Sequence, residues 1–323
     1  MSLFLVTGGA GFIGSHLVHA LVARGDRVRV LDDFSSGRME NLSGLDVGEP
    51  DTKSQVELVR GSITNPVHCR RACAGVDGIF HEAAQVSVPR SLEAPVESYE
   101  INVMGTLRVL EAARTNGVAR IVSASSSAVY GNTTTLPKIE SMPPDPLSPY
   151  ASGKLGGEAL MRVYGESHAM KTVSLRYFNV FGPRQADDSP YTGVIALFAR
   201  ALLDGRTPTI FGDGEQTRDL TYVDNVVQAN LLAMSADLPA GTVLNVGSGE
   251  RVSINQLYAL VRSLIGAKVD ARHAPARAGD VLHSLASIDR ARELVGYRPN
   301  VSWRDGLERT VAWYRSQRTA LRA

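Results

Sequence analysis

The sequence predicts an α/β protein in which a doubly wound parallel sheet is followed by a smaller mixed α/β lobe. The first 180 or so residues alternate short β-branched strands with amphipathic helical stretches, and strands are expected at residues 3–6, 27–31, 56–59, 78–81, 120–123 and 172–177. Such alternation is typical of a parallel sheet covered by helices on both faces. After Gly182 the pattern changes to helices at 194–203, 223–235, 253–265, 289–294 and 303–316, with extended pieces at 209–211 and 243–246. We expect one domain over residues 1–181 and a second over 182–323, and allow for the chain to cross back between them.

The composition excludes several classes of protein. The chain has 323 residues, of which 44% are apolar and 21% charged, and its formal net charge is +1. This charge provides no strong field for nucleic acid or an anionic membrane. No apolar run approaches the roughly 18 residues that span a bilayer, and the N-terminus does not resemble a signal peptide. Cys69 and Cys73 are expected to be reduced thiols, because four residues along a helix rarely allow disulfide geometry. We expect a cytoplasmic protein with no metal site and with neither nucleic-acid nor membrane partners.

A glycine-rich turn follows the first predicted strand and opens a helix. Within it, Gly9, Gly11 and Gly14 form a G-x-G-x-x-G pattern, in which the backbone can approach a pyrophosphate at the positive end of the helix. Asp32 closes the second strand, where a carboxylate accepts from the ribose hydroxyls of NAD and repels the 2′-phosphate of NADP. Arg38 keeps NADP open as a minor alternative. The sequence therefore predicts a Rossmann-like NAD site.

A candidate catalytic pair lies further along the chain. Tyr150 and Lys154 are four residues apart on a predicted helix, so their side chains share a face. A free tyrosine has a pKa of about 10, and the lysine cation would favour the phenolate, which would make a general base suited to neutral pH. A serine-rich run at 123–127 follows the fifth strand, at the edge of the sheet where ligands bind in such folds. A serine there can hydrogen-bond a reacting sugar oxygen.

These motifs resemble those of the extended short-chain dehydrogenases over residues 5–314, together with the run RDLTYVD at 218–224. The run HEAAQVSVPRS at 81–91 resembles UDP-hexose 4-epimerases, especially those that accept N-acetylhexosamines. The resemblance implies an NAD-dependent isomerase with Tyr150, Lys154 and Ser126 as catalytic residues. Tyr150 would deprotonate the sugar 4-hydroxyl, Ser126 would hydrogen-bond the 4-oxygen, and Lys154 would hold the nicotinamide ribose. It also implies a homodimer that packs through residues 96–115 and the helix of Tyr150.

The resemblance further assigns the binding residues. Those for NAD are Gly8, Gly11, Phe12, Ile13, Asp32, Asp33, Ser36, Gly37, Ser62, Ile63, Ala83, Ala84, Gln85, Asn102, Tyr150, Lys154 and Tyr177. Those for the UDP-sugar are Ser87, Ser126, Tyr150, Asn179, Phe211, Arg218, Arg277, Asp280 and Ser284. Asn179 would meet the diphosphate, Arg218 and Arg277 would clamp its phosphates, and Asp280 would bind the uridine ribose.

Two positions bear on the reaction and the sugar. Ser127 and Ala128 follow Ser126, where related 4,6-dehydratases carry an Asp-Glu pair and UDP-glucuronate decarboxylases a glutamate. We therefore predict 4-epimerisation, with a UDP-uronate 4-epimerase, a dehydratase, a net oxidoreductase or a non-catalytic nucleotide-sugar-binding protein as alternatives. Ser284 stands where epimerases restricted to plain hexoses carry a tyrosine. This predicts UDP-GlcNAc and UDP-GalNAc as substrates, with UDP-Glc and UDP-Gal as co-substrates.

Three residues depart from the family pattern. Ser62 replaces an aspartate at the adenine edge, which predicts looser NAD retention and an improvement on Ser62→Asp. Leu282 and Ser287 stand where relatives often show arginine and aspartate.

Overall fold

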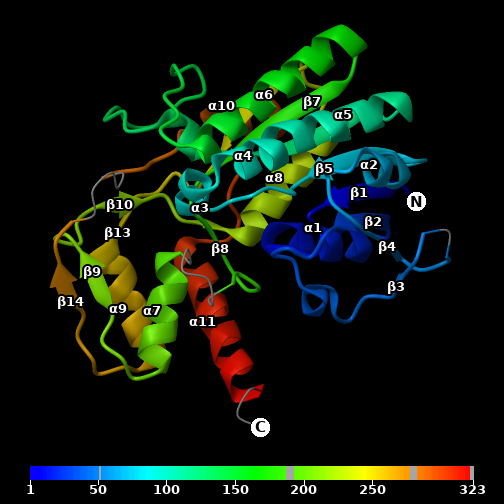
Figure 1. The fold of residues 1–323 in the computed structure, drawn as a ribbon. Helices are drawn as coiled ribbons and strands as arrows, with labels where there is room; N and C mark the ends of the chain where they lie inside the picture. Colours follow the sequence, from blue (N-terminus) through cyan, green and yellow to red (C-terminus); the bar gives the residue numbers. More distant parts are fainter. Residues whose placement is uncertain (51, 187–192, 277–281, 321–323) are drawn as a thin grey trace.

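An eight-stranded sheet with the strand order β12-β7-β6-β5-β1-β2-β4-β3 organises the molecule (Figure 1). The structure is a computed structural model that describes residues 1–50, 52–186, 193–276 and 282–320. Every strand pair in this sheet is parallel. The strands are β1 (Leu3–Thr7), β2 (Arg27–Asp32), β3 (Val47–Gly48), β4 (Val56–Arg60), β5 (Gly78–His81), β6 (Arg120–Ser126), β7 (Lys171–Tyr177) and β12 (Thr242–Val246).

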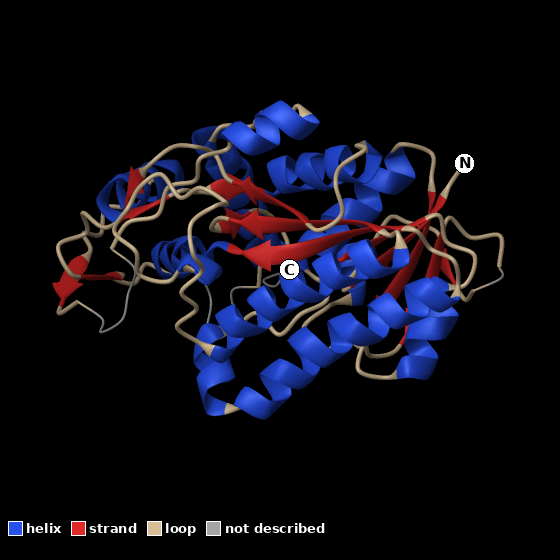
Figure 2. Ribbon diagram, turned by 90° about the horizontal axis from the view of Figure 1, so that it is seen from above, coloured by secondary structure: helices blue, strands red, loops and turns tan. Residues whose placement is uncertain are grey.

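Helices cover both faces of the sheet, as Figure 2 shows. One face packs against α2 (Pro66–Cys73), α5 (Thr106–Thr115) and α6 (Pro149–His168). The other packs against α1 (Phe12–Ala23), α8 (Val223–Ser235) and α10 (Asp289–Val295). Because side chains alternate along a strand, neighbouring residues point to opposite faces of the sheet. Leu5 packs in the apolar cluster with α2, α5 and α6, and Val6 packs in the cluster with α1, α8 and α10. The predicted doubly wound sheet is confirmed.

The six predicted strands are present, and two further strands complete the sheet. The short strand β3 pairs with β4 and was not expected. Strand β12 corresponds to the extended piece that the sequence suggested for the second lobe, but it pairs in parallel with β7, Thr242 facing Val173. Four of its five residues are buried, which fits a strand covered on both faces. The chain therefore returns to the first sheet after leaving it.

The second lobe has its own apolar core between α7 (Val194–Leu203), α9 (Ile254–Ile265) and α11 (Trp303–Ala320). Three two-stranded pairs flank it. They are β9 (Thr209–Phe211) with β14 (Arg272–Ala274), β10 (Thr217–Arg218) with β13 (Val252–Ser253), and β11 (Thr221–Tyr222) with β8 (Val180–Phe181). Figure 1 shows this lobe beside the carboxyl ends of the main strands.

The single helix expected at 96–115 is wrong in detail. The structure has α4 (Pro95–Tyr99), a π-helical segment η2 (Glu100–Gly105) and then α5, with α3 (Val88–Glu93) before them. Two single turns of 3₁₀-helix, η1 (Met39–Leu42) and η3 (Ser127–Tyr130), lie in the loops after β2 and β6. A π-helical turn inserts an extra residue into the helical repeat and is frequent at functional sites. Here it carries Asn102, which reaches the loop after β5.

Two expectations from composition concern the whole chain. Cys69 and Cys73 are free and buried, as predicted, and burial raises the pKa of the two thiols to about 11 and about 12. Within the described ranges, no helix combines the length and the apolar character needed to cross a membrane.

Candidate active site

The glycine turn between β1 and α1 leaves room only for backbone. Gly8 has a φ of +68°, and a Cβ on it would lie 2.8 Å from the backbone nitrogen of Ala83. A Cβ on Gly14 would lie 2.1 Å from the carbonyl oxygen of Gly8. Gly11 is the N-cap of α1 and has no side chain to cap the helix, so the N–H groups of Phe12 and Ile13 stand at a helix end that suits a phosphate. The turn therefore fits the pyrophosphate of a dinucleotide.

The acidic end of β2 holds the loop that follows it. The Asp32 carboxylate accepts from the backbone nitrogens of Ala10 at 2.9 Å and Phe34 at 2.8 Å, and burial raises its pKa. A Cβ on Gly37 would lie 2.6 Å from Asp32 Oδ1, so Gly37 passes close to the carboxylate. This loop is where the sequence predicts the adenosine ribose.

Ser62 is engaged differently from the prediction. Its hydroxyl lies near the Asp33 carboxylate and accepts from the Thr64 hydroxyl at 3.0 Å. Burial opposes ionisation of Asp33, but hydrogen bonds from Ser35 and Ser62 outweigh it and lower the pKa of Asp33. A carboxylate at position 62 would therefore face the ionised Asp33. On this geometry we expect Ser62→Asp to weaken NAD retention, which is the opposite of the expectation from sequence. The neighbouring Ile63 is buried against Gly105.

The loop after β5, which contains Ala83, Ala84 and Gln85, is fixed by Asn102. The Asn102 amide accepts from Gln85 N at 2.9 Å and donates to Gln85 O at 3.0 Å, much as a neighbouring strand would. Ala83 N donates to the Thr7 hydroxyl at 3.2 Å. A rigid loop at this edge suits a bound cofactor.

Beneath that loop, a buried chain of hydrogen bonds links three elements. The His81 ring bonds the Thr7 hydroxyl at 2.7 Å through Nδ1 and the Thr106 hydroxyl at 3.0 Å through Nε2. Burial, together with the charge of Lys154, lowers the pKa of His81 to about 3. The histidine is therefore neutral and structural at physiological pH.

The three predicted catalytic residues meet above β6. Helix α6 begins at a Ser148 cap whose hydroxyl accepts from Ala151 N at 3.1 Å, and this start places Tyr150 in the first turn. The Ser126 side chain lies near enough to the Tyr150 hydroxyl to favour its ionised form. Lys154 Nζ donates to the carbonyl oxygen of Ala124 at 2.9 Å. The structure thus brings together residues that lie far apart in the sequence.

The predicted electrostatics of Tyr150 are wrong for the chain itself. Burial raises the pKa of Tyr150, and the hydrogen bond from Ser126 offsets only part of this effect. Burial also lowers the pKa of Lys154 to about 8, against the opposing influence of the Glu82 carboxylate. The lysine charge is directed toward Ala124 and Glu82 rather than the phenol. Sequence spacing does not show how strongly the phenol of Tyr150 is desolvated in the folded protein.

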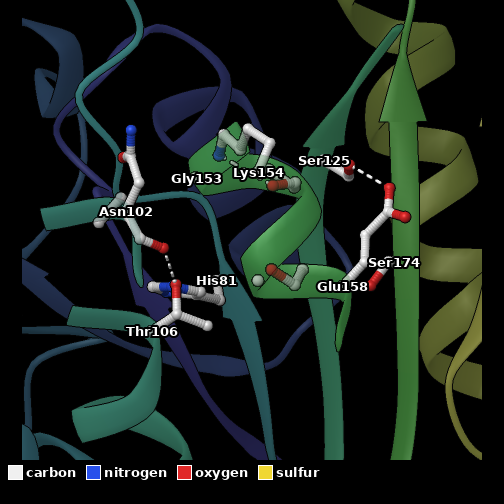
Figure 3. A pocket seen from close by; sticks show the side chains of 12 residues that line it. His81, Asn102, Thr106, Ser125, Gly153, Lys154, Glu158 and Ser174 are labelled. Carbon is white, nitrogen blue, oxygen red and sulfur yellow. Dashed lines mark hydrogen bonds between the residues drawn. The ribbon is translucent and has the colours of Figure 1, made fainter. Parts of the chain in front are cut away.

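A small polar cavity of about 10 Å³ lies under Lys154 (Figure 3). Its lining includes Glu158, whose carboxylate forms a bidentate pair with Arg176, both N–O distances being 2.8 Å. The Ser125 hydroxyl donates to the same carboxylate at 2.5 Å. The Arg176 guanidinium in turn covers the Tyr130 ring, 4.7 Å from its centroid. Glu158 and Arg176 were not predicted as site residues. Each is a charged residue within a segment whose pattern indicates a buried helix or strand, and this signal could have pointed to them.

Two predicted substrate residues contact each other. Asn179 Nδ2 donates to the carbonyl oxygen of Asp219 at 2.9 Å and to the Ser284 hydroxyl at 3.0 Å. Ser284 also accepts from Asp219 N at 3.2 Å. Both amide hydrogens of Asn179 are thus used within the chain, and a contact to the diphosphate would have to replace one of them. That contact stays a prediction.

The other predicted substrate residues occupy separate places around the second lobe and α3. Arg218 donates through Nη1 to Thr217 O at 3.0 Å and to Leu282 O at 3.3 Å. Phe211 ends β9. The Ser87 hydroxyl caps α3 by accepting from Arg90 N at 3.2 Å. Arg277 and Asp280 lie outside the described residues.

The departures at 282 and 287 also have local partners. The Leu282 side chain is exposed, and its carbonyl oxygen accepts from Thr217 N at 3.0 Å. The Ser287 hydroxyl donates to the Asp289 carboxylate at 2.8 Å at the start of α10. A short side chain at 287 therefore supports the helix start.

Two acids near the site were not predicted. Asp219 is fully buried, and its carboxylate accepts from Ser248 N, Gly249 N and Ala286 N, which ties the loop after β12 to the segment that contains Ser284. Glu82 follows β5 and accepts from the hydroxyl of Tyr177 at 2.8 Å. Asp219 stands in the recognised run at 218–224, but its partners are distant in sequence and could not be inferred.

A glycine turn after the first parallel strand, combined with a tyrosine and a lysine above the carboxyl edge of the sheet, defines a dinucleotide-dependent enzyme of the short-chain dehydrogenase type. The chain matches the NAD dependent epimerase/dehydratase family over residues 4–247, and it belongs to that family.

Comparisons with individual proteins agree with this assignment. The chain is 40% identical to a UDP-glucose 4-epimerase of Mycolicibacterium smegmatis, over 97% of this chain and 98% of that protein. Its fold is similar to a UDP-N-acetylglucosamine 4-epimerase from Methanobrevibacter ruminantium in complex with UDP-N-acetylmuramic acid, with a TM-score of 0.91, 36% identity, and coverage of 98% and 99%. It is also similar to a Thermus thermophilus UDP-glucose 4-epimerase in complex with NAD, with a TM-score of 0.86, 37% identity, and coverage of 97% and 99%. Relatives that match over nearly the whole chain include a decarboxylase and a dehydratase of sugar nucleotides, so family membership alone does not fix the reaction.

Proposed function

We propose that the protein is an NAD-dependent UDP-sugar 4-epimerase. The observation that carries the proposal is that Ser126 lies beside the Tyr150 phenol, in a site where no acid follows the serine. Ser127 and Ala128 begin η3, and Ala128 N donates to the Ser126 hydroxyl at 3.1 Å. A dehydratase or decarboxylase needs a further acid at this position, whereas an epimerase needs only to oxidise and reduce one carbon.

The residues present fit that chemistry. The Gly8–Gly14 turn, the Asp32 loop and the Asn102-held loop would bind NAD, which supplies a reversible hydride acceptor when bound. Tyr150 would take the proton of the sugar 4-hydroxyl and later return it, while Ser126 hydrogen-bonds the 4-oxygen. The keto sugar would turn over between these steps, held by its nucleotide tail.

The favoured substrates are UDP-GlcNAc and UDP-GalNAc, with UDP-Glc and UDP-Gal as co-substrates. The small Ser284 side chain supports this choice, and so does the likeness to an epimerase named for UDP-N-acetylglucosamine. Arg218 would bind the diphosphate, since a guanidinium matches phosphate oxygens bidentately. The assignment to Arg277 and Asp280 rests on the family resemblance alone.

We also propose a homodimer that packs through α4, η2, α5 and α6. Large apolar side chains are exposed in this region: Val96 is 81% exposed and Leu92 on the adjoining α3 61%. A cluster of exposed apolar side chains on neighbouring helices is costly in water and typical of an interface.

The decisive test is incubation of the purified protein with UDP-GlcNAc, UDP-Glc, UDP-GlcA and dTDP-Glc, with products identified by ¹H NMR and NADH followed by absorbance. We expect interconversion of C4 epimers without net NADH. A 4-keto-6-deoxy product, release of CO₂ or accumulation of NADH would assign the protein to one of the alternatives. Tyr150→Phe is the matched control. It should abolish turnover and preserve nucleotide binding, whereas loss of both would implicate folding.

A further inference from the structure

The loop after β5 places a carboxylate next to the strand that Lys154 contacts. His81 pairs with Ser123 in the parallel register between β5 and β6, so Glu82 comes next to Ala124. The Glu82 side chain reaches across β6 to β7, where the Tyr177 hydroxyl donates to its Oε1 at 2.8 Å. Asn230 on α8 donates to the Tyr177 hydroxyl at 2.8 Å. The carboxylate is therefore anchored from the α1–α8 face of the sheet.

Lys154 approaches the same strand residue from the opposite face. It extends from α6 and donates to the carbonyl oxygen of Ala124 at 2.9 Å. The α6 and α8 layers lie on opposite sides of the sheet (Figure 2). The ammonium and the carboxylate thus approach the Ala124 backbone from opposite faces without forming a direct ion pair. The protein excludes much of the solvent there, so opposite charges attract more strongly than in water.

Other titratable groups near Lys154 do not supply this charge. His81 on β5 is neutral, because burial and the lysine charge lower its pKa. Glu158, one turn along α6, is held by both arms of Arg176 from β7. Burial raises the pKa values of the phenols of Tyr150 on α6 and Tyr177 on β7. Among the described groups around the lysine, Glu82 is the carboxylate without an arginine partner.

We propose that Glu82 is the counter-ion of Lys154 and a positioning residue that keeps the lysine charged in the catalytic site. The proposal deepens the proposed function, on which its catalytic meaning rests. A neutral Lys154 could not act as a cation toward a bound ribose. Glu82 would therefore extend the pH range of activity on the alkaline side.

The electrostatics of the pair agree with this role. Burial lowers the pKa of Lys154, and the Glu82 carboxylate raises it again, leaving it at about 8. Burial raises the pKa of Glu82 to about 7, although the Tyr177 hydrogen bond and the lysine charge both favour the ionised form. Each group thus favours the charged form of the other.

The direct test is an NMR titration of Lys154 in the purified protein. The sequence contains five lysines, so ¹³C-lysine labelling gives a spectrum in which Lys154 can be assigned by its loss in Lys154→Arg. In Glu82→Gln, which preserves the shape and the acceptor for Tyr177, the pKa of Lys154 should fall by roughly one unit, because the ammonium loses its nearest opposite charge. Glu166→Gln is the matched control, an exposed carboxylate on the same helix, and should leave the titration unchanged. An unchanged Lys154 pKa in Glu82→Gln, or an equal fall in the control, would overturn the proposal.

The pH dependence of turnover gives the second readout. The alkaline limb of kcat should move to lower pH by the same unit in Glu82→Gln, with KM for the sugar nucleotide little changed. Glu82→Asp keeps the charge and should restore at least half of the shift in both measurements. If Glu82→Asp behaves like Glu82→Gln, the effect is one of shape and the counter-ion role is refuted. The titration does not depend on which sugar is turned over, so it separates failure of this proposal from failure of the epimerase assignment.

Discussion

Glu158→Gln removes one charge from a buried ion pair directly beneath the candidate active site. The side chains of Glu158 and Arg176 are almost inaccessible, the two residues being 7% and 4% exposed. The pair is bidentate with both distances at 2.8 Å, and Ser125 adds a third hydrogen bond. Glutamine keeps the shape but leaves the Arg176 guanidinium buried without a counter-charge.

The expected cost follows from that uncompensated charge. Removing one partner of a buried pair destabilises proteins by about 3–5 kcal/mol. The entropy of unfolding is about 2 cal/mol/K per residue near the transition, so a chain of this length loses roughly 4–7 °C of Tm if its lobes unfold together. Arg162 and Glu166 form a comparable pair on the exposed side of α6, where the side chains are 70% and 58% exposed. Glu166→Gln should cost less than about 1 kcal/mol, because water screens that pair.

Thermal unfolding followed by circular dichroism distinguishes the two sites. We expect Glu158→Gln to melt several degrees below the wild type and Glu166→Gln to melt within about 2 °C of it. A Glu158→Gln variant as stable as the Glu166→Gln variant would show that the buried pair contributes no more than an exposed one, and would refute the reasoning. The double variant Glu158→Leu/Arg176→Met should recover part of the loss, because it removes both buried charges.

Three further predictions concern the cofactor, the sugar and the interface. Ser62→Asp should weaken NAD retention several-fold on gel filtration, since the new carboxylate would repel Asp33, whereas Ser62→Ala should have a smaller effect; improved retention in Ser62→Asp would contradict the geometry. Ser284→Tyr should lower kcat/KM for UDP-GlcNAc relative to UDP-Glc by at least about tenfold, with Ser284→Ala as the control for the lost hydrogen bonds. Equal losses for the two sugars would remove the size argument. Val96→Asp should shift the protein from dimer to monomer in light scattering, while Leu282→Asp, an equally drastic change at another exposed apolar side chain, should not. An unchanged mass in Val96→Asp would exclude α4 from the interface.

The parts of the fold that sequence reasoning predicted best are those determined by local pattern. The strands that carry the site contain short apolar runs between helical patterns, and they occur where expected. The glycine turn could also be predicted from the sequence. A Cβ on Gly14 would lie 2.1 Å from the carbonyl oxygen of Gly8, so this position requires glycine, and the glycine pattern is visible in the sequence. Tyr150 and Lys154 follow from helical spacing.

What the sequence could not give depends on contacts between distant segments. The pairing of β12 with β7 joins residues about 70 positions apart, and nothing local distinguishes that strand from the short strands of the second lobe. The π-helical turn at Asn102 interrupts a pattern that otherwise continues as an ordinary helix. The pKa of Tyr150 depends on burial, and burial follows from packing. Ser62 acquires its partner Asp33 only when two loops meet.

The late return of β12 to the sheet limits how this chain can be divided. A fragment ending at residue 181 would retain seven of the eight strands but leave β7 with an open hydrogen-bonding edge, and α8 would no longer cover the apolar side of β6 and β7. Bare parallel edges of this kind recruit other chains. We expect such a fragment to aggregate or to exchange strands between copies. Attempts to graft a different sugar-binding lobe onto this nucleotide-binding half should therefore keep residues 223–246 with the recipient.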